Sequence, residues 1–134
     1  MTKPSTPKIV AHRGNHLDFL ENTMEAFESC KSWGIEFDVR WTKDFVPVIH
    51  HDETLERIFG IKSKISDFDF AQLRATVPKV PTLEEVLAIR KPDGKTFHNM
   101  IEVKVDHGLF HPQGLENLKN ILKKLAPVDD FHLL

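Results

Sequence analysis

Hydrophobic and polar side chains alternate along several short segments of the chain, and this pattern predicts a sheet. Residues 8–11 and 46–49 are short apolar runs, and residues 35–40 alternate between apolar and polar side chains. A second alternating segment covers residues 98–106, and residues 131–134 begin another apolar run. Short runs of this kind are typical of β-strands.

Between these strands, the spacing of apolar residues predicts helices at residues 22–34, 83–90 and 114–126. Capping-box pairs mark three helix starts, at Asn22 with Glu25, Ser66 with Asp69, and Thr82 with Glu85. Residues 55–59 fit one helical turn, and residues 60–64 a polar link. The order strand, helix, strand up to Val39 predicts a parallel βαβ unit.

The connection between the second and third strands must reverse the chain. Only residues 41–45 separate the two apolar runs, and a parallel crossover needs about a dozen residues or more. A hairpin centred near Lys43 pairs residues whose numbers sum to about 86. This register predicts that His51 lies level with Ile35 and Glu36, so that a histidine returns beside a carboxylate.

Three clusters of titratable residues lie near the ends of these strands: His12-Arg13-Gly14, Glu36-Phe37-Asp38 and His50-His51-Asp52. Because strand side chains alternate between faces, Glu36 and Asp38 share one face. Imidazole, guanidinium and paired carboxylates on one rim indicate metal-assisted acid–base chemistry on a phosphate ester. The alternative is ordinary: a carboxylate pair is usually a solvated strand face, and a single histidine is usually a surface or core residue.

A further polar pair lies on the strand predicted at residues 98–106. Glu102 and Lys104 share one face, while Ile101, Val103 and Val105 share the other. The pair could be an ion pair, but its alternation matches that of the Glu36 strand, which favours a third metal ligand. His107, Gly108 and His111 follow in a loop, where we expect exposure to solvent.

These motifs resemble the glycerophosphodiester phosphodiesterase family. The residues that carry the resemblance follow the family order across nearly the whole chain: Ala11-His12-Arg13-Gly14, Glu21-Asn22-Thr23, Glu36-x-Asp38-Val39, Thr42-Lys43-Asp44, His51-Asp52, Leu55 and Arg57, Pro81-Thr82-Leu83-Glu84-Glu85-Val86, and Glu102-x-Lys104. Two positions depart from the family pattern: Leu20 replaces a common proline, and Ile58-Phe59 replaces Thr-Thr. Both departures concern loop shape.

The resemblance implies a role for each of the polar residues in these motifs. The expected roles are general acid–base catalysis by His12 and His51, phosphate binding by Arg13 and Lys104, and coordination of a divalent cation, Ca²⁺ or Mg²⁺, by Glu36, Asp38 and Glu102. The implied activity is metal-dependent hydrolysis of small-molecule glycerophosphodiesters to glycerol phosphate and an alcohol, within glycerophospholipid metabolism. Sphingomyelinase D-like phosphodiesterases share this arrangement and are a near alternative.

The expected fold is α/β, a partial TIM (β/α) barrel containing roughly the first half of the barrel. Parallel units begin near Lys8, Ile35, Ile101 and Phe131, whereas a complete barrel needs about 250 residues. The 134 residues are therefore expected to form one domain, residues 1–134, that is truncated at its C-terminus. Two sheet edges would remain unpaired. The short chain is then a fragment of a longer gene, a homodimer that closes the sheet, or the product of a decayed reading frame, and these three explanations remain as alternatives. A catalytically silent half-barrel that binds a phosphate ligand or a partner chain is the rival function.

Charge and composition narrow the function classes. The net charge is −2, with 18 basic and 20 acidic residues, so no global field attracts nucleic acid or an anionic membrane. Cys30 is the single cysteine, which excludes an internal disulfide and predicts a buried, inert thiol. No apolar run approaches the ~20 residues of a membrane span, and no signal-peptide pattern is present. The expected location is the cytoplasm.

Overall fold

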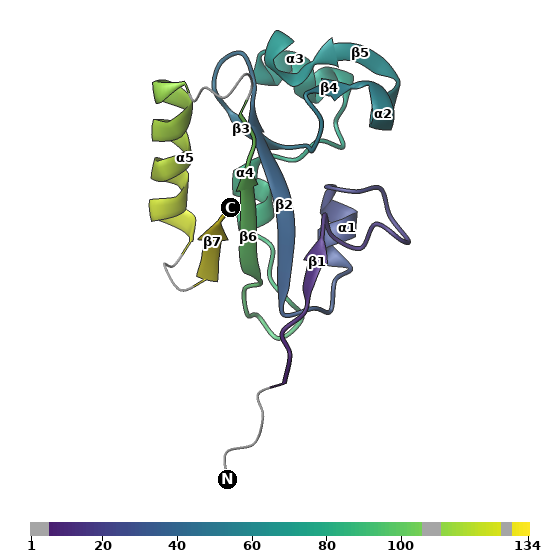
Figure 1. Ribbon diagram of the computed structural model, residues 1–134, viewed down its shortest axis with the longest axis vertical. Coiled ribbons are helices and arrows are strands. Elements are labelled where there is room, and N and C mark those ends of the chain that lie inside the picture. The colour runs from purple at the N-terminus through teal and green to yellow at the C-terminus, as the bar shows by residue number, and fades with distance from the viewer. Residues whose placement is uncertain (1–5, 106–110, 127–129) are drawn as a thin grey trace.

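The computed structural model describes residues 6–105, 111–126 and 130–134 (Figure 1). Within these residues the main sheet has five strands: β1 (Val10–His12), β2 (Gly34–Trp41), β3 (Pro47–Ile49), β6 (His98–Val103) and β7 (Phe131–Leu133). Four of them run parallel in the order β1-β2-β6-β7. Strand β3 pairs antiparallel with β2. The predicted parallel unit and the predicted reversal are therefore both confirmed.

The helices α1 (Met24–Glu28), α4 (Leu83–Leu87) and α5 (Pro112–Leu125) pack against one face of the sheet. That face presents Ile35, Phe37 and Val39 of β2, which are fully buried beneath the helices. The opposite face of β2 therefore presents Glu36 and Asp38, because side chains alternate along a strand.

A small excursion follows β3 and forms the upper right of Figure 1. It consists of β4 (Thr54–Leu55), α2 (Glu56–Phe59), β5 (Ile61–Lys64), a 3₁₀ turn η1 (Ile65–Asp67) and α3 (Phe70–Thr76). The helical turn predicted at residues 55–59 is confirmed in α2, whereas the polar link predicted at residues 60–64 is wrong, because β5 pairs with β4 there. A second core stabilises this unit, with Leu55, Ile65 and Leu73 fully buried in it.

Several predicted helix ends are wrong. Helix α1 begins after Thr23, whose side chain accepts from the Ala26 N–H, so Asn22 is not its cap. It ends at Glu28, not at residue 34, because Gly34 begins β2. A Cβ on Gly34 would lie 2.7 Å from the carbonyl oxygen of His98, so the contact between neighbouring strands requires glycine at this position.

The capping boxes of the two later helices had mixed outcomes. Asp69 caps α3 through a capping box with Gln72, so the predicted cap at Ser66 is wrong. The capping box of Thr82 with Glu85 is confirmed in α4, which ends at Leu87, before the predicted residue 90.

The hairpin between β2 and β3 has a different register from the predicted one. Val39 pairs with Ile49 and Trp41 with Pro47, so the turn is centred one residue later, at Asp44. The turn closes where the Thr42 N–H donates to the Val46 carbonyl at 3.1 Å. The pairing of His51 with Ile35 is therefore wrong, since His51 lies in a bend beyond the end of β3.

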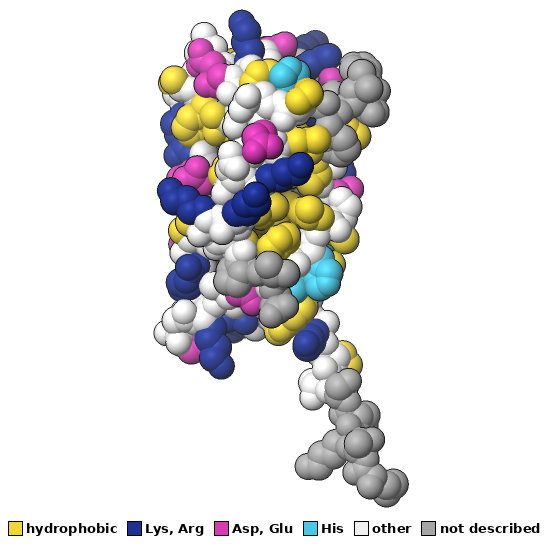
Figure 2. Space-filling model, turned by 90° about the vertical axis from the view of Figure 1, so that its left-hand side faces the viewer, with side chains coloured by type: hydrophobic (Ala, Val, Ile, Leu, Met, Phe, Trp, Pro, Cys, Tyr) yellow, Lys and Arg dark blue, Asp and Glu magenta, His cyan; other side chains and the backbone are white. Residues whose placement is uncertain are grey.

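Strands β1 and β7 lie at the two ends of the parallel order among the described residues. Leu133 of β7 and the following Leu134 are more than half exposed. Figure 2 shows the face that carries α5, where hydrophobic side chains gather beside Lys and Arg side chains. In the described part of the chain, no helix has the length and apolar character needed to cross a membrane.

Candidate active site

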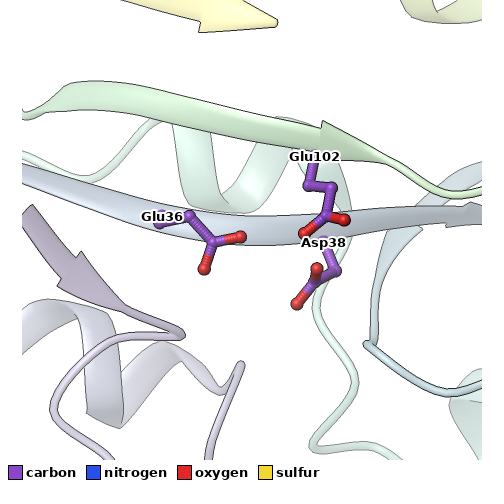
Figure 3. A group of neighbouring side chains, drawn as sticks. All are labelled: Glu36, Asp38 and Glu102. Carbon is purple, nitrogen blue, oxygen red and sulfur yellow. The ribbon is translucent and has the colours of Figure 1, made fainter. Parts of the chain in front are cut away.

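Three carboxylates meet on the sheet face that the helices leave uncovered. Glu36 and Asp38 project from β2 and Glu102 from β6, with Asp38 and Glu102 directly paired across the two strands. One oxygen of each residue lies within 4.8 Å of the oxygens of the other two. Figure 3 shows the three side chains turned toward one another. Asp38 is fully buried, and Glu36 is 7% exposed.

Several buried oxygens in and beside this group accept no hydrogen bond from the described residues. They are Oε1 of Glu36, Oδ1 of Asp38 and Oδ1 of the neighbouring Asn22. Burial, followed by repulsion from Asp38, raises the pKa of Glu36 to about 7. Buried polar groups are normally paired, so these oxygens need a partner. Hard divalent cations prefer oxygen ligands of this kind, and the donor set fits such an ion.

The turn after β1 brings the backbone of Arg13 beside the carboxylate of Glu36. Arg13 and Gly14 both have left-handed backbone conformations, with φ of 58° and 78°. A Cβ on Gly14 would lie 2.9 Å from backbone and side-chain atoms of Ala26, so only glycine fits. In this conformation the Arg13 N–H donates to the Glu36 carbonyl at 2.9 Å and to Glu36 Oε2 at 3.2 Å.

Two cationic side chains border the carboxylates. Nε of Arg13 lies 3.7 Å from Oδ2 of Asp38, and Nζ of Lys104 lies 3.7 Å from Oδ1 of the same carboxylate. Lys104 also donates to Oε1 of Glu102 at 2.9 Å. The ion pair considered from the sequence is therefore present, and Glu102 still belongs to the carboxylate group.

One histidine lies beside this group, and a second lies beside Asp52. His12, at the end of β1, places its Nε2 3.5 Å from Oε2 of Glu36, and its side chain is 61% exposed. The hydrogen bond from Lys104 chiefly, then the hydrogen bond with Asp38 and, last, the charge of His51 lower the pKa of Glu102. The Nδ1 of His51 lies 2.7 Å from Oδ1 of Asp52.

Other histidines have different surroundings. His50 is buried, and its Nε2 lies 3.0 Å from the Thr54 carbonyl, which fits a structural role. The expected exposure of His111 is confirmed; its Nδ1 accepts from the Gln113 N–H at the start of α5, and its ring stacks on Phe45. His107 and Gly108 lie outside the described residues.

Sequence reasoning missed four polar residues around the site. Asn22, predicted to cap a helix, instead donates to Oδ2 of Asp38 at 3.1 Å from a left-handed backbone. Glu21 accepts hydrogen bonds from Arg13 and Arg57. Arg57 in turn holds Asp52. These residues stand in the motifs quoted above, but their pairing depends on chain segments far apart in sequence.

Parallel strands with helices on one face and charged side chains on the other are typical of part of an α/β barrel. Residues 12–132 match the glycerophosphoryl diester phosphodiesterase family. The chain belongs to this family.

Three relatives show how much of the family fold the chain contains. It is 32% identical over 123 residues to a glycerophosphodiester phosphodiesterase of Bacillus altitudinis, a match covering 81% of this chain and 49% of the relative. A crystal structure of a Thermotoga maritima glycerophosphodiester phosphodiesterase has 31% identity and a TM-score of 0.76, over 96% of this chain and 54% of that one. A phosphodiesterase of Oleispira antarctica, solved in complex with the product sn-glycerol-3-phosphate, has 25% identity and a TM-score of 0.74, over 95% of this chain and 56% of that one.

The chain thus spans about half the length of the relatives it matches. Its parallel sheet and helices superimpose on that half of the solved structures. The predicted α/β fold, a partial TIM barrel, is confirmed.

Proposed function

We propose that this protein is a metal-dependent phosphodiester hydrolase that cleaves glycerophosphodiesters to glycerol phosphate and an alcohol. The observation that carries the proposal is the group of Glu36, Asp38 and Glu102, whose oxygens lie within 4.8 Å of one another. Membership of the phosphodiesterase family supports the reaction type. The glycerol 3-phosphate bound to the Oleispira antarctica relative supports the product.

The three carboxylates would hold a divalent cation, Ca²⁺ or Mg²⁺, through oxygens that include the buried ones without hydrogen bonds. When bound, such a cation supplies charge that neutralises a non-bridging phosphate oxygen. The backbone N–H of Arg13, which donates to the Glu36 carboxylate, and the side-chain amide of Asn22, which donates to Asp38, would keep these carboxylates oriented toward it.

Arg13 and Lys104 would bind the phosphate of the substrate. Their cationic groups approach Asp38 from two sides, at 3.7 Å each. Both side chains are 20% exposed, so they can reach a ligand without first leaving a closed core. Their charges would stabilise the negative charge that grows on the phosphate oxygens in the transition state.

His12 and His51 would transfer the protons. One imidazole would take a proton from the attacking oxygen while the other protonates the departing alcohol. The Nε2 of His12, 3.5 Å from Oε2 of Glu36, and the electrostatic effect of His51 on Glu102 support these roles. This reaction would serve the breakdown of glycerophospholipids, and the cytoplasmic location stays a prediction.

The test is hydrolysis by the full chain of glycerophosphocholine, glycerophosphoethanolamine and glycerophosphoglycerol, followed by a coupled assay for glycerol 3-phosphate. We expect turnover that EDTA stops and that added Mg²⁺ or Ca²⁺ restores. Full rates in EDTA would contradict the carboxylate roles. Choline release from sphingomyelin, with no hydrolysis of the three glycerophosphodiesters, would favour the sphingomyelinase D-like alternative.

A second candidate is a catalytically silent half-barrel that binds phosphate or a partner chain. Among the described residues, no strand pairs with the outer edge of β1 or of β7, and Leu133 and Leu134 are exposed. These features favour it, because an unpaired strand edge can pair with another chain. A homodimer through these edges would double the mass measured by light scattering. Soluble protein that binds inorganic phosphate and shows no turnover would support this candidate over the hydrolase.

A further inference from the structure

A chain of alternating charges runs along the rim of the site, outside the three carboxylates. Its members, in spatial order, are Arg13, Glu21, Arg57, Asp52 and His51. Arg57 lies in α2 of the excursion and is 36 residues from Glu21 in sequence. The excursion thus brings one guanidinium between two loops that carry proposed site residues.

Arg57 is paired with two carboxylates at once. Its Nη1 and Nη2 donate to the two oxygens of Glu21, each at 2.9 Å. Its Nε and Nη2 donate to the two oxygens of Asp52, at 2.8 and 3.0 Å. Paired hydrogen bonds between a guanidinium and a carboxylate fix orientation as well as charge. A lysine in this place could not hold both carboxylates in the same way.

On one side, this arrangement controls the proton of His51. The hydrogen bonds from Arg57 are the main cause that keeps the pKa of Asp52 well below its usual range. An ionised Asp52 only accepts hydrogen bonds, so the Nδ1 of His51, at 2.7 Å, must carry the hydrogen. The Nε2 of His51 is then the nitrogen that can exchange a proton with substrate.

On the other side, Arg57 shares Glu21 with Arg13. The Nη1 of Arg13 donates to Oε2 of Glu21 at 3.2 Å. Arg57 is the main cause that lowers the pKa of Glu21, which keeps this acceptor charged. Glu21, held from one side by Arg57, thus limits where the Arg13 guanidinium can lie.

We propose that Arg57 is a positioning residue that couples the proton-transfer histidine to the phosphate-binding arginine. By holding Asp52 in place beside His51 it fixes the tautomer of His51, and through Glu21 it limits the orientation of Arg13. This inference rests on the proposed function for its effect on turnover, but the tautomer of His51 can be measured without substrate or metal.

The first experiment is a double-mutant cycle of Arg57→Ala and Asp52→Asn in the full chain. We expect Arg57→Ala to lower kcat on the order of 10- to 100-fold, as loss of a group that orients a reacting residue commonly does. In the Asp52→Asn background the same change should lower kcat by a smaller factor, because the effect through Asp52 is already lost and only the effect through Glu21 and Arg13 remains. Lys62→Ala, which removes an exposed cation on the neighbouring strand β5, is the matched control and should leave kcat unchanged.

Chemical rescue separates a positioning role from a folding role. Millimolar guanidinium should restore part of the kcat of Arg57→Ala and none of that of Asp52→Asn. Arg57→Lys should keep the thermal unfolding temperature of the wild type but remain closer to Arg57→Ala in kcat. Mg²⁺ binding should be equal in all these variants, because within the described residues Arg57 donates to Asp52 and Glu21 and not to the three carboxylates.

The second experiment records ¹⁵N–¹H correlations of the histidine rings, assigned with a His51→Gln variant. Wild-type His51 should carry its hydrogen on Nδ1, and both Arg57→Lys and Asp52→Asn should give a mixture of tautomers. An unchanged tautomer in both variants would overturn the proposal, as would a kcat of Arg57→Ala within twofold of the wild type. A wild-type protein with no turnover would refute the proposed function alone, and the ring spectra would still decide the role of Arg57.

Discussion

The raised pKa of Glu36 predicts that the affinity for a divalent cation depends on pH. Burial and the neighbouring charge of Asp38 raise the pKa of this carboxyl to about 7. A cation ligand must be ionised, so protonation competes with binding. With this pKa, about 9% of Glu36 is ionised at pH 6 and about 91% at pH 8. The apparent dissociation constant for Mg²⁺ or Ca²⁺ should therefore be about tenfold larger at pH 6.

Isothermal titration calorimetry of the full chain measures this effect in two ways. The affinity at pH 6 and pH 8 gives the tenfold ratio. Titrations in buffers with different ionisation enthalpies count the protons released on binding, which should be about 0.9 per ion at pH 6 and about 0.1 at pH 8 if Glu36 is the source.

Three variants make the result specific to Glu36. Glu36→Gln should weaken binding at pH 8 and remove most of its pH dependence, whereas Glu116→Gln, an exposed carboxylate on α5, should change neither. His12→Gln tests the imidazole that lies 3.5 Å from Glu36 and should keep the pH dependence. Equal affinity at both pH values, or an unchanged pH dependence in Glu36→Gln, would refute the reasoning.

Three other predictions follow from the same site. His12→Ala and His51→Ala should each abolish turnover, and each variant should keep the thermal unfolding curve of the wild type. Activity in both variants would contradict the acid–base assignment. Without metal, the folded-state pKa of Glu36 exceeds its ordinary value of 4.5, so ionisation destabilises the fold as pH rises from about 4.5 to above 7. Chemical denaturation in EDTA should show that the free energy of unfolding falls by about 3 kcal/mol across that range, relative to the Glu36→Gln variant. A free energy of unfolding that rises instead would contradict the raised pKa. Gly14→Ala should destabilise by about 1–3 kcal/mol, since φ is 78° and its Cβ would meet Ala26; an unchanged denaturation midpoint would show that the turn can relax.

The local features of the sequence were enough to predict part of this arrangement. The alternation around Phe37 places Glu36 and Asp38 on one face, because a strand has a side-chain period of two and needs no other segment to set it. The cap of Thr82 with Glu85 was predictable for the same reason, since its two hydrogen bonds join residues three apart.

Other features depended on segments far apart in the chain. Asn22 has the composition of a helix cap, yet its side chain donates to Asp38, because β1 and β2 pair in parallel and bring that loop over the carboxylate. The hairpin register differed from the predicted one because one left-handed residue, Phe45, moves the centre of the turn. Neither outcome can be deduced from residue type alone.

Which residues line each strand face was predictable from the sequence, because the two-residue side-chain period of a strand depends only on local backbone geometry. Which faces and loops meet depends on the tertiary structure. Glu102 contacts Asp38 only because β6 pairs with β2, and Arg57 contacts Glu21 across 36 residues. Such contacts form only when burial of the common core has offset the chain entropy lost in bringing distant segments together. Local sequence patterns do not encode that balance, so the rim of the site became visible only in the folded chain.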